Sequence, residues 1–112
     1  LARAMTEAKR DLEEAQSALE QAAHDAAGLQ KAYRIAKSLA WTRADGTVAA
    51  RDRHVDKAVA DERYEAKLSE DLRVVALEKV RSCRAVFTGI QTLTNAWREE
   101  VAFARGGGGD DR

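Results

Sequence analysis

The side chains most often used in covalent catalysis and metal binding are few in this chain and lie far apart. His24 and His54 are thirty residues apart, and neither has the neighbouring cysteine or carboxylate spacing of a zinc site. Cys83 lies midway between Ala76 and Ile90 at seven-residue steps, which is typical of a buried structural thiol rather than an exposed nucleophile. These residues therefore predict neither a metal site nor a covalent mechanism.

The paired carboxylates Glu13-Glu14, Glu99-Glu100 and Asp110-Asp111 are neighbours in sequence. Neighbours on a helix point about 100° apart, so they cannot act as acid and base on one substrate. The run of four glycines near the C-terminus lacks the strand, lysine and helix of a phosphate loop. We therefore expect a protein that is not an enzyme, uses no cofactor and has no small-molecule substrate.

Positive charge is concentrated in one stretch, although the whole chain is neutral. Residues 31 to 54 carry six basic and two acidic side chains, whereas residues 1 to 30 carry three basic and six acidic ones. Basic side chains with an aromatic ring can hold a phosphate backbone and stack a base. Cations near a helix C-terminus also interact with the helix dipole and then need no ligand. The candidate site for single-stranded nucleic acid or an acidic partner consists of Lys31, Arg34, Lys37, Trp41, Arg43, Arg51 and Arg53.

The elements that would position this site are long helices. A chain of 112 residues with 34% charged residues and no proline has the composition of a coiled coil. In the first forty residues, apolar and small side chains recur at alternating steps of four and three, as in a heptad repeat. This pattern predicts a helix from about residue 1 to 42, with a stripe formed by Leu1, Met5, Ala8, Leu12, Ala15, Leu19, Ala22, Ala26, Leu29, Tyr33, Ala36 and Ala40.

A turn over residues 43–47 should follow, because Gly46 can adopt positive φ and Thr47 can cap the next helix. The second helix is predicted from about 48 to 105, with Ala76, Cys83, Ile90, Trp97 and Ala104 at seven-residue steps and Val48, Val55, Val59, Ala66 and Leu72 nearer the turn. The expected fold is an all-α, long antiparallel helical hairpin over residues 1–105, and the glycine-rich residues 106–112 are expected to be disordered. A break near Ser69 or Gly89 would give a third helix and is the alternative topology.

A turn centred near Gly46 places Leu29 near Glu62 and Leu1 near Ile90. Roughly the last fifteen helical residues would then have no partner, and they are rich in apolar side chains. The end could fold back after Gly89, be covered by residues missing before Leu1, or pack on another chain. The predicted protein interface, for a second copy or another protein, consists of Ile90, Leu93, Trp97, Val101 and Phe103.

The sequence contains neither a run of about 20 apolar residues that could span a bilayer nor a charged-then-apolar leader. Its single cysteine excludes an internal disulfide and is typical of a reducing compartment. We expect a cytoplasmic protein that has no membrane partner.

Three stretches resemble a family. "AYRIAKSLAW", "GTVAARDRHVDKAVADE" and "IQTLTNAWREEV" are similar to small all-helical bacteriophage early-region proteins, in which a Tyr-Arg-x-Ala-Lys helix, a Gly-Thr-Val turn with a downstream Arg, and a terminal Leu and Arg-Glu segment recur in this order. The resemblance covers roughly residues 30 to 101, lends no catalytic residues and implies a role near recombination, single-strand binding or replication. The matching positions are Tyr33, Arg34, Ala36, Lys37, Gly46, Thr47, Val48, Arg51, Leu93, Arg98 and Glu99.

Taken together, the sequence predicts a non-enzymatic helical binding or adaptor protein, phage-derived and associated with DNA recombination or replication through its basic turn end. The alternative is a structural or assembly coiled coil that self-associates or docks to a single host or virion protein.

Overall fold

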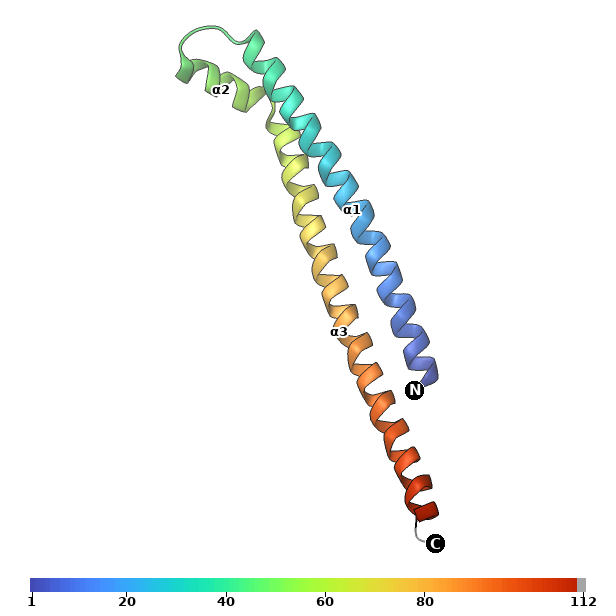
Figure 1. The fold of residues 1–112 in the computed structure, drawn as a ribbon. Coiled ribbons are helices and arrows are strands. Elements are labelled where there is room, and N and C mark those ends of the chain that lie inside the picture. The colour runs from blue at the N-terminus through green and yellow to red at the C-terminus, as the bar shows by residue number, and fades with distance from the viewer. Residues whose placement is uncertain (111–112) are drawn as a thin grey trace. The chain divides into compact units, whose positions relative to one another are not determined.

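The chain is all-α in the computed structural model, which describes residues 1–110, with side chains as far as Gly106. Three helices follow one another: α1 (Ala2–Arg43), α2 (Val48–Ala58) and α3 (Ala60–Asp110). Figure 1 shows α3 returning antiparallel to α1 after the short α2. The predicted all-α antiparallel helical hairpin is confirmed, and so are the helix at about 1–42 and the turn after it.

Two compact units divide the hairpin. One unit contains residues 17–78, which include the second part of α1, all of α2 and the start of α3. The other contains residues 1–16 together with α3 from Lys79 onwards. Each unit has its own α1 segment packed against its own α3 segment.

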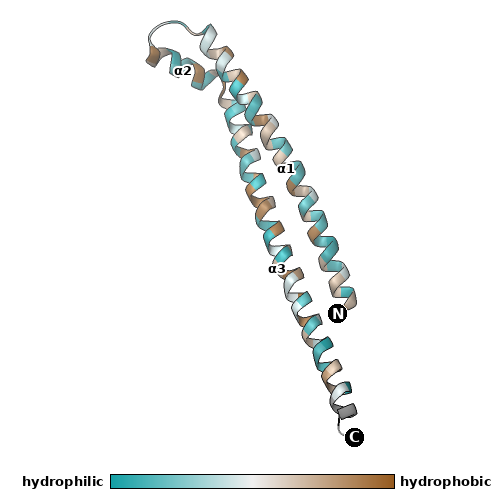
Figure 2. Cartoon of the chain, viewed as in Figure 1, coloured by the Kyte–Doolittle hydropathy of each residue, from teal (hydrophilic) through white to brown (hydrophobic). Residues whose placement is uncertain are grey.

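The predicted heptad stripe of α1 forms the helix–helix contact. From Met5 to Ala40, every position of the stripe is buried or half-buried. Ala8, Ala15 and Ala26 are only 3–4% exposed. Side chains this small allow two helices to approach at the low end of the usual 8–10 Å separation. Figure 2 shows apolar and polar residues interleaved along α1 and α3, as expected for helices with one buried stripe each.

The second predicted helix is bent, and the bend lies at Val59. Thr47 caps α2 as predicted, since its side chain accepts a hydrogen bond from the Ala50 amide at 3.2 Å. Gly46 has the positive φ (101°) expected for the turn. Val59 leaves the helical conformation, with φ −114° and ψ 18°. Its amide still donates to the carbonyl of Val55 at 3.0 Å.

The third helix of the alternative topology is present, but the break that separates it lies at Val59. It does not lie near Ser69 or Gly89, because both of these residues are inside α3. Ser69 does not cap a new helix. Its side chain is 7% exposed, and its hydroxyl donates to the Ala66 carbonyl one turn earlier, at 2.8 Å. A serine that bonds back to its own helix continues the helix instead of starting another.

Burial of two valines explains why the chain bends where it does. Val55 and Val59 are each 2% exposed and pack together with Ala40, against which Tyr33 and Ala36 also lie. No proline or glycine lies at the bend. The bend therefore follows from tertiary packing, which turns α2 towards the end of α1 and buries both side chains.

The bend also shifts the pairing of the helices from the predicted register. The Gln30 side-chain amide donates to the Ala66 carbonyl at 3.4 Å, whereas its neighbour Leu29 was predicted near Glu62. Leu1 lines a groove with Thr94 and Trp97 instead of lying near Ile90. The register prediction was wrong because the eleven residues of α2 do not pair along α1 as a continuous helix would.

Two further predictions fail near the ends of the second stripe. Val48 is 68% exposed and Leu72 is 55% exposed, so neither belongs to the buried face, whereas the predicted residues Val55, Val59 and Ala66 do. The helix predicted to end at about 105 runs on to Asp110, so residues 106–110 of the tail predicted to be disordered are helical. A helix already formed gains one backbone bond per added residue, which opposes the cost of about 1 kcal/mol per glycine. Residues 111–112 lie outside the described residues.

Val59→Ala should destabilise the fold by about 2 kcal/mol, because it removes two methyl groups from a fully buried site. Urea unfolding followed by circular dichroism measures this change. Val48→Ala is the matched control at an exposed position, where we expect a change below about 0.5 kcal/mol. Equal losses for the two variants would show that the Val59 contact does not hold the bend.

Candidate binding surfaces

The residues first considered for catalysis are separated in the structure. His24 on α1 and His54 on α2 are both exposed. Cys83 is half-buried on the face of α3 that packs on α1, as predicted from its heptad position. Among the described residues, no three His, Cys, Asp or Glu side chains lie close enough together to hold a metal ion.

Three basic residues of the predicted site on α1 cover about a third of the helix circumference. Lys31, Arg34 and Lys37 are all exposed, but Lys31 and Lys37 point about 120° apart at 100° per residue. Arg43 at the end of α1 and Arg53 on α2 are also exposed. The predicted basic site is therefore accessible, but it is not one compact patch.

Trp41 and Arg51 form a contact that belongs to the fold. The Arg51 guanidinium lies 5.3 Å from the centre of the Trp41 ring, within the range of a cation–π interaction. The same side chain donates from Nε to the Ala44 carbonyl at 3.0 Å. Arg51 thus satisfies a carbonyl just beyond the C-terminus of α1. Trp41 remains 37% exposed.

Carboxylates lie among these cations. A groove of about 560 Å³ is lined by Lys37 and Trp41 of α1 and by Asp52 and Asp56 of α2. Residues 55 to 71 carry six acidic and three basic side chains, and the contact between Gln30 and Ala66 places this acidic stretch beside the basic end of α1. The excess positive charge of residues 31 to 54 is therefore offset by the acidic side chains of residues 55 to 71, which lie beside it.

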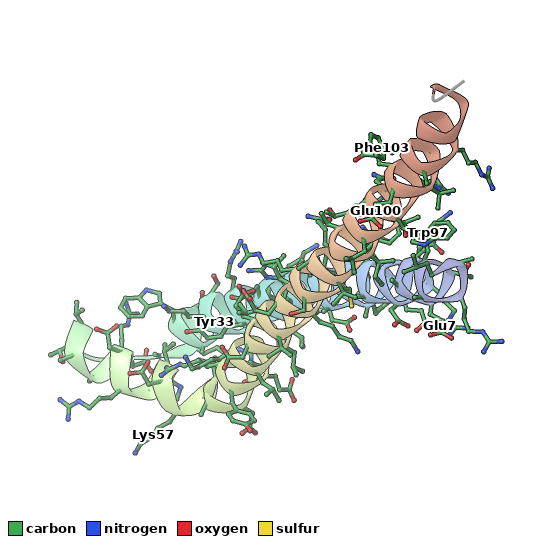
Figure 3. The ribbon with its side chains drawn as sticks, turned by 90° about the horizontal axis from the view of Figure 1, so that it is seen from below. Glu7, Tyr33, Lys57, Trp97, Glu100 and Phe103 are labelled. Carbon is green, nitrogen blue, oxygen red and sulfur yellow. The ribbon has the colours of Figure 1, made fainter. Side chains whose placement is uncertain are left out.

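Arg63 links α3 to α2 where the chain bends. Its Nη2 lies 2.7 Å from Oδ1 of Asp56 on α2. A hydrogen bond to the Tyr33 hydroxyl, followed by the interaction with Asp56, raises the pKa of Arg63. Tyr33, which lies near the bend in Figure 3, packs against the buried cluster of Ala40, Val55 and Val59. On α3 a hydrogen bond from Arg73 lowers the pKa of Glu70.

The predicted protein interface near the end of α3 is only partly one surface. Ile90 and Val101 are half-buried, while Leu93 and Trp97 are 62% and 57% exposed. These four side chains fall within about 80° of the helix circumference. Phe103 is 82% exposed and points about 120° away from Trp97, on the other side of α3 (Figure 3).

Trp97 also lies beside the first turn of α1. A groove of about 700 Å³ is lined by Leu1, Ala2, Met5, Thr94, Trp97 and Arg98. The Thr94 hydroxyl is buried there and has no hydrogen-bond partner among the residues that the structure describes. Part of the surface predicted to be unpaired is therefore in contact with α1.

A second apolar surface was not predicted from the sequence. Leu68, Leu72 and Val75 of α3 are 44–64% exposed, and Ile35 and Leu39 of α1 are 50–51% exposed. Gly28, Ala32, Ile35 and Leu39 follow one another at helical steps of four, three and four, so they share a face of α1. We name this surface the apolar flank: Gly28, Ala32, Ile35, Leu39, Leu68, Leu72 and Val75.

A groove brings Gly28 of α1 beside Leu68 and Leu72 of α3. It has a volume of about 550 Å³ and is lined by His24, Asp25, Gly28 and Leu29 of α1 and by Glu65, Leu68, Ser69 and Leu72 of α3. The signal in the sequence was a second series of apolar residues beside each heptad stripe. It was missed because Leu72 was assigned to the stripe itself.

Comparisons with known proteins add no relative. No protein-family model, curated protein or solved structure matches this chain. The resemblance to bacteriophage early-region proteins therefore stays a prediction. None of the described helices is long and apolar enough to cross a membrane.

Trp97→Ala tests the surface at the end of α3. If two chains pack through Leu93 and Trp97, the variant should lower the mass measured by light scattering at fixed concentration, because a large aromatic anchor is lost. Phe103→Ala is the matched control, since that ring is equally apolar but lies on another face. A wild-type chain that stays monomeric at high micromolar concentration would contradict self-association through this surface.

Proposed function

We propose that this chain is a non-enzymatic helical adaptor that docks another protein on its apolar flank. The observation that carries the proposal is the exposure of Leu68 and Leu72 beside a groove whose floor includes Gly28. These leucines add little to the helix–helix contact, whose buried positions are filled mainly by small residues and valines. Exposed apolar side chains that share a groove are a mark of protein interaction sites.

Leu68→Ser with Leu72→Ser should abolish docking and leave the fold intact. Because both side chains are exposed, we expect the free energy of unfolding to change by less than about 0.5 kcal/mol per site. Proteins retained from a cell extract by the immobilised chain, identified by mass spectrometry, measure docking. The matched control is Val48→Ser with Val74→Ser, which removes two exposed aliphatic side chains outside the flank. Unchanged retention by the flank variant would refute the proposal.

Nucleic-acid binding at the basic end is the second candidate. It is favoured by the exposure of Lys31, Arg34 and Lys37, none of which forms an ion pair in the described part of the chain. With this function, the chain would be a phage protein associated with DNA recombination or replication, as the resemblance implies.

Arg34→Glu with Lys37→Glu should abolish binding to a single-stranded oligonucleotide without loss of helix, as measured by fluorescence anisotropy and circular dichroism. For the wild type, the logarithm of affinity should fall with the logarithm of salt concentration, with a slope of about −0.7 per phosphate neutralised. Lys9→Glu with Arg10→Glu makes the same charge change elsewhere on α1 and should have a smaller effect. Equal affinity of the wild type and the two double variants for the oligonucleotide would refute nucleic-acid binding at the basic end.

A further inference from the structure

The carboxylates around the apolar flank indicate what kind of partner it fits. We propose that the groove on the flank receives a basic amphipathic helix, with its apolar residues against Gly28, Leu68 and Leu72 and its Lys or Arg side chains against the surrounding acids. This inference rests on the proposed docking function and specifies the partner.

The floor of the groove can accept apolar side chains. Gly28 is exposed, and a Cβ atom added to it would meet nothing within 4 Å. The Leu68 and Leu72 side chains line the same groove from α3. A helix that presents apolar residues at i, i+3, i+4 and i+7 can place one of them over the glycine and the others along the leucines.

The margins of the groove are acidic. Asp25 and Glu65 line it from the two helices, and both are exposed. Asp61 lies seven residues before Leu68, and Asp71 lies three residues after it. Residues at these spacings lie on or beside the same face of a helix.

These carboxylates lack cationic partners in the described part of the chain. Asp25 accepts a hydrogen bond from the neutral Gln21 side chain at 2.9 Å, and none of the four acids belongs to an ion pair there. Among the described cations, Lys31 lies beside this face of α1, three residues after Gly28. A partner helix with Lys or Arg next to its apolar face would supply the missing opposite charge.

The same charges oppose packing of the flank against a second copy. A two-fold contact presents the same surface from both chains. The carboxylates of the two copies would then face one another across the groove, which is unfavourable. The inferred partner therefore carries positive charge, opposite to that of the carboxylates around the flank.

Two labelled peptides of about 18 residues, long enough for a helix to form on binding, test the inference with the full chain. One places Leu on one helical face and Lys on the other, and the second replaces Lys by Glu. We expect anisotropy titrations to show the Lys/Leu peptide binding at least about tenfold more tightly than the Glu/Leu peptide, with the difference falling as salt is raised.

Charge reversal provides the matched comparison. Asp25→Lys with Glu65→Lys should reverse the preference, so that the Glu/Leu peptide binds more tightly. Glu20→Lys with Asp52→Lys makes the same change in net charge at exposed positions that do not line the groove, and it should keep the wild-type preference. An equal effect of the two double variants would overturn the inference.

Two further outcomes separate this inference from the proposed function. If the wild type shows no preference between the peptides while Leu68→Ser with Leu72→Ser still abolishes protein retention, docking stands and the basic partner is refuted. If the wild-type chain is a dimer by sedimentation and reversal at Asp25 and Glu65 changes that mass, the flank is occupied by a second copy and the inference is wrong.

Discussion

Close packing of α1 against α3 through alanine is the constraint on which the rest of the structure depends. Ala8, Ala15, Ala26 and Ala66 are almost completely buried, but each contributes only one methyl group to the contact. The buried area per turn is small, since apolar burial contributes about 25 cal/mol per Å². Larger apolar residues such as Leu68 and Leu72 lie beside this narrow contact and remain accessible to other proteins.

The sequence was sufficient to predict what depends on local periodicity. The positions of the α1 stripe from Met5 to Ala40 are buried or half-buried, and Thr47 caps the helix after the turn, because heptad spacing and capping chemistry act over a few residues. The bend at Val59 could not be read in this way. No glycine or proline lies there, and its cause is the contact of Val55 and Val59 with Ala40, which is distant in sequence.

One missed bend accounts for the wrong register and changes what surrounds the candidate sites. It moved Leu1 to Thr94 and Trp97 and so brought α1 against part of the surface predicted to be unpaired. It also brought an acidic stretch back beside the basic end of α1, where Asp52 and Asp56 share a groove with Lys37. Charge counted along the sequence therefore overstated the charge available at that end of the fold.

The contacts around Val59 bear on how this fold tolerates changes in chain length. Two contacts fix the pairing of α1 with α3: Val59 packs near Tyr33, and Gln30 meets Ala66. In each contact the second half of the hairpin contributes a residue that comes after the turn and α2, namely Val59 or Ala66. Residues 44–54 lie before these contacts and contain only one buried side chain, Ala44. Insertions and deletions during evolution would thus be absorbed between Arg43 and Val55, while the apolar flank kept its register.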